Sequence, residues 1–135
     1  MSTILEITGA DRNLTSMTRG LKAAKMEDIL NEQGPYTILA PVNFAFSKLS
    51  AAAFEELIKR DTTGRLTDMM SNHILKGKKM MMDFRNGQKL TTINGKELDV
   101  TVSNDEVRIN GSKILSKDRQ GSNGVIHSVD TVNTH

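Results

Sequence analysis

Three histidines are the side chains of this 135-residue sequence best suited to acid–base chemistry or metal binding near neutral pH: His73, His127 and His135. His135 is the last residue, and neither internal histidine has a second histidine three or four positions later, the spacing of a helical metal site. Each internal histidine lies among apolar residues, where an imidazole is more often a hydrogen-bonded core group. We therefore expect His73 and His127 to be structural.

Other catalytic patterns are missing from the sequence. It contains no cysteine, no G-x-S-x-G nucleophile elbow and neither of the glycine-rich phosphate-binding motifs. Asp28 and Asp118 are the best isolated carboxylates for a metal, yet acids in such positions are usually just solvated. The sequence therefore predicts no catalysis, no metal and no cofactor.

The segment Lys76–Arg85, KGKKMMMDFR, is the one locally basic stretch. It could contact an anionic polysaccharide, lipid headgroups or a nucleic acid, or it could be a solvated edge. The whole chain carries 18 basic and 16 acidic residues, a net charge of +2, and only 4% aromatic residues. Nucleic-acid binders concentrate positive charge and aromatic platforms far more, so we expect no nucleic-acid partner.

The composition is that of one globular domain, which we expect to span residues 1–135 with its core at about residues 4–132. Hydrophobic residues make up 37% of the chain and charged residues 25%. No apolar run reaches the roughly 18 residues that a membrane helix needs. The N-terminus has no basic segment followed by an apolar one, so if the natural protein is exported we expect its signal peptide to lie outside this sequence.

The chain divides into two parts by its hydrophobic period. Up to about Met82 the pattern is helical, interrupted by a buried strand at Tyr36–Leu39 that should stop at Pro41. Asn43 is placed to cap the helix that follows. From Gly87 onward apolar and polar residues alternate, as in Lys96–Val102.

Turn signals separate these alternating runs. Asn-Gly pairs begin at residues 86, 94, 110 and 123, and Asn104-Asp105 is a further turn signal. Residues 86–130 are therefore predicted to form an antiparallel β-sheet wedge with one wet face, and the N-terminal helical half to pack around it. The predicted class is α+β.

Three stretches resemble the conserved boxes of the fasciclin domain, in the same order and at similar separation. Residues 37–46 read TILAPVNFAF, residues 72–77 read NHILKG, and residues 123–130 read NGVIHSVD. In this chain Leu39 stands for a Phe of the family pattern, Val42-Asn43 for Thr-Asp and Asn72 for Tyr. The residues matched to the structural motif of the family are Thr37, Ala40, Pro41, Asn43, Ala45, Phe46, Asn123, Gly124, His127 and Asp130.

The resemblance implies a non-catalytic adhesion or binding module of an extracellular, periplasmic or cell-surface protein. Its partner would be a cell-surface or matrix protein, with a polysaccharide as a further possibility, and the chain would be a monomer or weak oligomer. Some animal members bind integrins through short Asp-Ile motifs and a Tyr-His pair. Carried over, these positions are Asp28-Ile29, Asn72-His73 and Asp118, where Arg119 replaces the Ile.

Two alternatives stay open. Ile29 and Leu30 could both be core positions, with Asp28 simply exposed between them. The chain could also be an accessory domain that binds carbohydrate or another anionic polymer through Lys76–Arg85.

Overall fold

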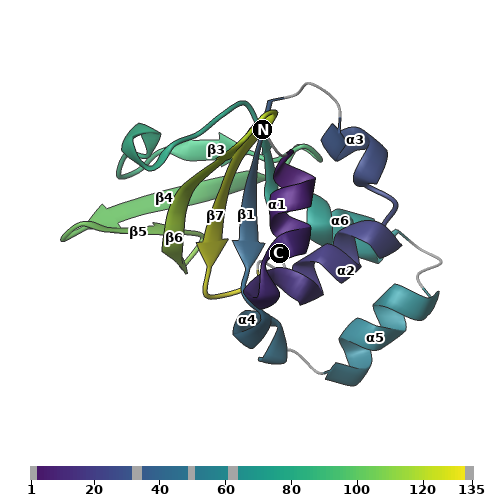
Figure 1. Ribbon diagram of the computed structural model, residues 1–135. Helices are drawn as coiled ribbons and strands as arrows, with labels where there is room; N and C mark the ends of the chain where they lie inside the picture. Colours follow the sequence, from purple (N-terminus) through teal and green to yellow (C-terminus); the bar gives the residue numbers. More distant parts are fainter. Residues whose placement is uncertain (1–2, 32–34, 49–50, 61–63, 133–135) are drawn as a thin grey trace.

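In the part of the chain that the structure describes, seven strands form one sheet in the order β2-β1-β7-β6-β5-β4-β3, and helices cover one side of it (Figure 1). The computed structural model describes residues 3–31, 35–48, 51–60 and 64–132. The strands are β1 (Tyr36–Pro41), β2 (Ile74–Lys76), β3 (Lys89–Thr91), β4 (Glu97–Ser103), β5 (Glu106–Ile109), β6 (Ser112–Gly121) and β7 (Gly124–Val129). The helices are α1 (Ile4–Ala10), α2 (Thr15–Ala23), α3 (Glu27–Asn31), α4 (Asn43–Ser47), α5 (Ala51–Arg60) and α6 (Arg65–Ser71), with 3-10 turns η1 (Arg12–Leu14) and η2 (Met81–Asp83).

The predicted α+β class is confirmed, and so is the antiparallel arrangement of residues 86–130. Strands β3 to β7 pair antiparallel, each with the next. Every turn between them falls on one of the Asn-Gly or Asn-Asp signals, and Asn104, Asp105 and Asn110 adopt the left-handed backbone that such turns require. On β4 buried and exposed residues alternate up to Val100, which leaves one face wet.

The sheet as a whole is mixed, because β1 runs parallel to β7. The sequence pattern also omitted β2, a short strand antiparallel to β1 that lies in the part expected to be helical. Both strands are buried along most of their length, and a short apolar run does not distinguish a strand from a helix.

Asn43 caps a different helix from the one predicted. It is the first residue of α4, whose N-cap residue is Val42 without a side-chain cap. Its Oδ1 instead accepts the backbone N–H of Ser16 at 2.9 Å, and its amide donates to the carbonyl of Arg12 and the hydroxyl of Thr15. It therefore satisfies a free N–H in the first turn of α2, across the fold.

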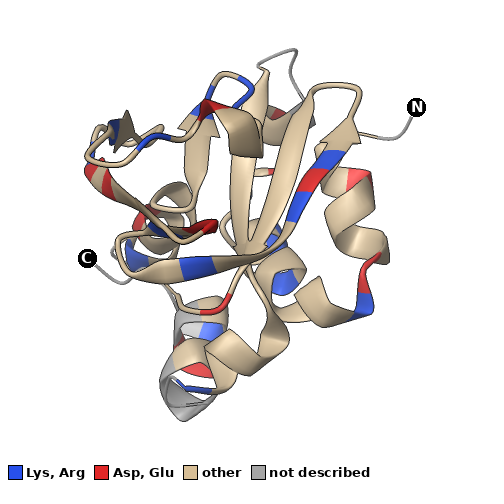
Figure 2. Cartoon of the chain, turned by 90° about the vertical axis from the view of Figure 1, so that its left-hand side faces the viewer, with Lys and Arg blue, Asp and Glu red and all other residues tan. Residues whose placement is uncertain are grey.

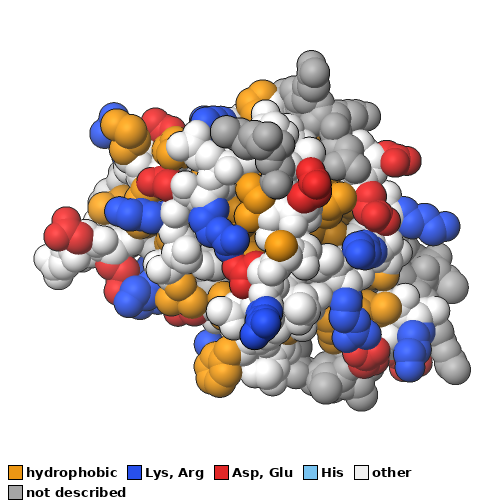
Figure 3. Space-filling view, viewed as in Figure 1, with side chains coloured by type: hydrophobic (Ala, Val, Ile, Leu, Met, Phe, Trp, Pro, Cys, Tyr) orange, Lys and Arg blue, Asp and Glu red, His pale blue; other side chains and the backbone are white. Residues whose placement is uncertain are grey.

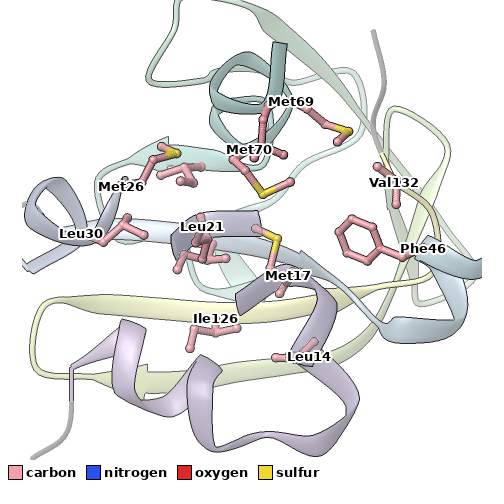
Figure 4. Packing of buried hydrophobic residues seen from close by; sticks show 14 of the residues in the cluster. Leu14, Met17, Leu21, Met26, Leu30, Phe46, Met69, Met70, Ile126 and Val132 are labelled. Carbon is pink, nitrogen blue, oxygen red and sulfur yellow. The ribbon is translucent and has the colours of Figure 1, made fainter. Parts of the chain in front are cut away.

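Two hydrophobic clusters hold the layers together. The larger lies between the helices and the sheet and contains buried methionines from α2, from α6 and from the position just before α3, which pack with Leu21, Phe46 and Ile126 (Figure 4). Unbranched methionines fill irregular gaps well, which suits the meeting of short helices at different angles. The smaller cluster is built by residues of the curled sheet, among them Leu75, Leu98 and Val107.

The two end strands of the sheet, β2 and β3, come close to each other and almost close it into a barrel. Leu75 and Thr92 form an isolated antiparallel bridge, and the N–H of Ile93 donates to the carbonyl of Ile74 at 3.0 Å. Beyond this bridge the two strands separate, which leaves an open seam.

Candidate functional site

The first and last family-like stretches lie side by side, because β1 and β7 pair in parallel. Tyr36 is opposite Gly124, and Leu39 is opposite His127. A Cβ placed on Gly124 would lie 1.9 Å from the carbonyl oxygen of Tyr36. This approach of backbone to backbone admits only glycine, which explains the Asn-Gly pair in chemical terms.

Asn123 joins three segments beside this pair of strands. Its Oδ1 accepts the backbone N–H of Ile4 at 2.9 Å, and its Nδ2 donates to the carbonyl of Leu30 at 2.5 Å. Its own carbonyl accepts the N–H of Tyr36 at 3.0 Å. The side chain is buried and ties α1 and α3 to the sheet.

Thr37 holds the start of the basic segment. Its hydroxyl donates to the carbonyl of Gly77 at 2.7 Å and accepts the N–H of Lys79 at 2.8 Å. The threonine hydroxyl both donates and accepts a hydrogen bond. These two bonds take the place of backbone pairing between strands at the point where the chain leaves β2.

His127 fastens the same segment from the centre of the sheet. Its Nε2 lies 2.6 Å from the carbonyl of Lys79, and its Nδ1 lies 3.1 Å from the backbone nitrogen of Asp118. Because a carbonyl only accepts and an N–H only donates, these partners require a neutral ring with its proton on Nε2. The ring is fully buried and meets Phe84 edge-on at 5.5 Å between centroids.

The surroundings keep His127 neutral. Burial lowers the pKa of the imidazole, and the hydrogen bond to Lys79 and the charge of Asp118 oppose this only in part. Asp118 Oδ1 is 4.0 Å from Nδ1, and the same oxygen accepts the N–H of Met81 at 2.8 Å.

Asp118 therefore has a local structural role rather than that of a free surface acid. It lies at an irregularity of β6 between Ser116 and Arg119 and has a left-handed backbone, φ 57°. Its side chain is 32% exposed and bonds to η2. We name the group formed by Thr37, Asp118 and His127 together with the backbone of residues 77–81 the fastening cluster.

His73 and Asn72 are also in the interior. Asn72 is 3% and His73 2% exposed, at the junction of α6 and β2. His73 Nδ1 lies 2.8 Å from the carbonyl of Met69, and burial lowers the pKa of the ring from 6.5 to about 4. Asn72 Oδ1 accepts from Asn94 at 3.2 Å. These side chains are not available for direct contact with a partner in this conformation.

The Asp28-Ile29 pair is different. It lies on α3, where Asp28 is exposed and Ile29 is 41% exposed, while Leu30 is fully buried. The interpretation that both Ile29 and Leu30 are core positions is thus correct for Leu30 only. Asp28 lies on α3 and Asp118 lies on β6, and α1, β1 and β7 lie between these two elements (Figure 1). The fold does not gather the five predicted partner-contact residues on one surface.

The arrangement offers no catalytic set in the part of the chain that is described. His73 and His127 are buried, and no group of three or more His, Asp or Glu among the residues with described positions could hold a metal ion. Likewise, none of the described helices is long and apolar enough to cross a membrane. His135 lies outside the described residues.

Charges are interspersed over the molecule. Lys and Arg are interspersed with Asp and Glu over the cartoon of Figure 2, and both signs are mixed on the face shown in Figure 3. The basic segment itself is partly engaged: the Lys78 ammonium donates to Gln120 at 2.5 Å. Lys76 and Lys79 instead line a groove at the seam between β2 and β3, which sequence reasoning missed because its other wall comes from Gln88–Thr91.

The family model described as "Fasciclin domain" matches residues 12–133. A solved structure described as a FAS1 domain pair from the insect cell adhesion molecule Fasciclin I superimposes with a TM-score of 0.84, covering 97% of this chain and 50% of that one at 19% identity.

Two relatives illustrate the range of proteins that contain similar sequence. Protein sll1483 of Synechocystis is 30% identical over 130 residues, which cover 96% of this chain and 72% of that protein. Human periostin is 36% identical over 124 residues, which cover 92% of this chain but only 14% of periostin. The chain therefore spans most of the cyanobacterial relative and a small part of the human one.

Proposed function

Because the chain belongs to the fasciclin domain family, we propose that it is a non-catalytic binding module that attaches to a protein of a cell surface or extracellular matrix. Its structural relative is a cell adhesion molecule. The buried, neutral state of His73 and His127 supports a module without acid–base chemistry. We further propose that the module works outside the cell, in the periplasm or at the cell surface, as a monomer or weak oligomer.

The contact that we propose is centred on Asp28 and Ile29 of α3. The observation that carries it is the exposure of Ile29, an apolar side chain beside an acidic one on a helix whose next residue, Leu30, is fully buried. An exposed apolar group next to a charge suits a small contact, in which the apolar group contributes affinity and the charge contributes orientation. Asn72, His73 and Asp118 contribute indirectly, by holding the fold.

An attachment assay tests this proposal. Beads coated with the chain are applied to cells or matrix of the source organism, and the retained fraction is counted after washing. The variant Asp28→Asn/Ile29→Ser should weaken attachment by about 5–30-fold, the effect of losing about 1–2 kcal/mol at a central contact. A matched control, Asp68→Asn/Leu115→Ser, removes another exposed acid and another exposed apolar side chain, since Leu115 is 52% exposed.

Equal attachment of the α3 variant and the parent would refute the α3 contact. If, in addition, neutralising Lys76, Lys78 and Lys79 abolished attachment, the basic segment would be the adhesive surface. The accessory-domain alternative would then replace the present proposal.

A further inference from the structure

The seam between β2 and β3 contains a groove of about 450 Å³, which we name the seam groove. This volume is within the range of pockets that hold small molecules. The two strands are bridged at Leu75 and Thr92, and the groove is lined by the chain that continues from β2 and by the chain that leads into β3. It therefore lies where the curled sheet does not close completely.

Part of the lining of the seam groove is apolar. Leu75 and Leu90 line it, and both belong to the smaller hydrophobic cluster of the curled sheet. Ile93 also lines it, and this side chain is only partly buried where it packs against the larger cluster. An aliphatic chain laid along these three side chains would remove apolar surface from water, which favours binding in proportion to the area covered.

Two lysines make the seam groove positively charged. Lys76 and Lys79 line it, and within the described ranges neither ammonium group forms an ion pair with a carboxylate. Lys89 lines it too, but its ammonium is paired with Asp99 of β4 at 2.5 Å. A lysine stem can lie along apolar surface while its ammonium group stays at the boundary with water. The groove therefore combines an apolar lining with two uncompensated cations.

Lys79 is held in place by the fastening cluster. Its N–H donates to the Thr37 hydroxyl at 2.8 Å, and its carbonyl accepts from Nε2 of His127 at 2.6 Å. Both partners are fully buried. The backbone of Lys79 is therefore fixed from two sides, and this wall of the groove is formed before any ligand arrives, which lowers the cost of binding.

We infer that the seam groove binds a small amphiphilic carboxylate, an anion with a short aliphatic chain like that of a medium-length fatty acid. The carboxylate accepts hydrogen bonds from the Lys76 and Lys79 ammonium groups. The aliphatic chain covers Leu75, Leu90 and Ile93. The residues that line the groove include no aromatic side chain on which a sugar ring could stack, so this lining suits an aliphatic ligand better than a glycan.

Amide NMR titrations of the full chain with defined probes test this inference. The main probe is sodium octanoate at pH 7 and low salt, and the amide signals of Lys76, Lys79, Leu90 and Ile93 should shift as it binds. We expect a Kd on the order of 0.1–1 mM, because the ligand is small. The variant Lys76→Gln/Lys79→Gln should weaken binding by about tenfold, since it removes both charges and keeps most of each side chain.

Three controls separate the charged and the apolar parts of the site. Octanol keeps the aliphatic chain and loses the charge, and acetate keeps the charge and loses the chain, so each should bind about tenfold more weakly than octanoate. The variant Lys22→Gln/Lys117→Gln makes the same change in net charge at exposed positions outside the groove lining. It should leave the Kd for octanoate within about twofold.

Each contrary result overturns the inference. Shifts that are absent, or that fall outside the groove, would exclude this site. Octanol or acetate binding as well as octanoate would show that the lysines or the apolar lining take no part. Equal effects of the two lysine pairs would mean that the attraction is unspecific, and binding of octyl phosphate without binding of octanoate would assign the groove to a phosphate ester.

These outcomes are independent of the proposed function. The probe comparisons use the parent chain, so they do not depend on whether a variant folds. The probes and the lysine variants also differ from the beads and the α3 variant of the attachment assay, so either proposal can fail without the other.

Discussion

Replacing His127 by alanine should lower the free energy of unfolding and should loosen the segment that His127 holds, residues 79–83. The change removes the acceptor for the N–H of Asp118 and the donor for the carbonyl of Lys79, and it opens space beside Phe84. A net hydrogen bond contributes about 1 kcal/mol, and the lost packing adds a similar amount or more. The sum is about 2–4 kcal/mol in the free energy of unfolding.

Urea denaturation at pH 7, followed by circular dichroism, measures this loss. Hydrogen exchange gives a second readout, because residues 79–83 depend on the fastening cluster and their amides should exchange faster than those of α2. A His127→Gln variant carries both a donor and an acceptor, so it should recover part of the lost stability.

The reasoning would be refuted by an unchanged urea midpoint together with an imidazole that titrates near 6.5. That result would make His127 an accessible group and would reopen its use in surface chemistry.

The remaining predictions concern other buried contacts. Burial lowers the pKa of His73 from 6.5 to about 4, so the unfolded chain takes up a proton first as the pH falls. The stability that the neutral His73 ring contributes is therefore complete above pH 6.5, and it falls by about 3 kcal/mol as the pH is lowered to 4. Urea titrations at several pH values should show a weaker dependence of the unfolding free energy on pH for a His73→Gln variant. Asn123→Ala should cost about 2–4 kcal/mol, because it leaves the N–H of Ile4 and the carbonyl of Leu30 without a partner, and thermal unfolding would show a loss of several degrees. Gly124→Ala should prevent native folding, since its Cβ would overlap backbone atoms, and an ordinary dispersed amide spectrum for this variant would contradict the close approach.

Much of the sheet could be predicted because its turns are local. An Asn-Gly pair adopts the left-handed backbone of a tight hairpin by itself, so the sequence marks the ends of β4 and β5 directly. The parallel pairing of β1 with β7 has no such local signal. It depends on contacts between segments far apart in the chain.

β6 was harder to foresee for a second reason. Its irregularity at Asp118 changes the side-chain register, and its central residues are exposed or half-buried, so the apolar alternation of a strand is lost.

The candidate site could be predicted only where the residue and its neighbours in the sequence indicate whether the side chain is buried. The structure places His73 and His127 in the interior, as apolar neighbours suggest. The roles of Asn43 and Asp118 were missed, because a cap or a fastening bond to another segment depends on tertiary position and not on neighbouring residues. The groove at the seam between β2 and β3 was missed for the same reason, since its walls meet only after the sheet curls.

Hydrogen exchange of the chain while it is attached to cells or matrix of the source organism tests the binding function most directly. If Asp28 and Ile29 form the contact, the amides of α3 should exchange more slowly in the attached chain than in the free one. The exchange rates of the amides of α5, a different helix, should be the same in the attached and the free chain. An attached chain whose α3 amides exchange as fast as in solution would contradict the proposed contact.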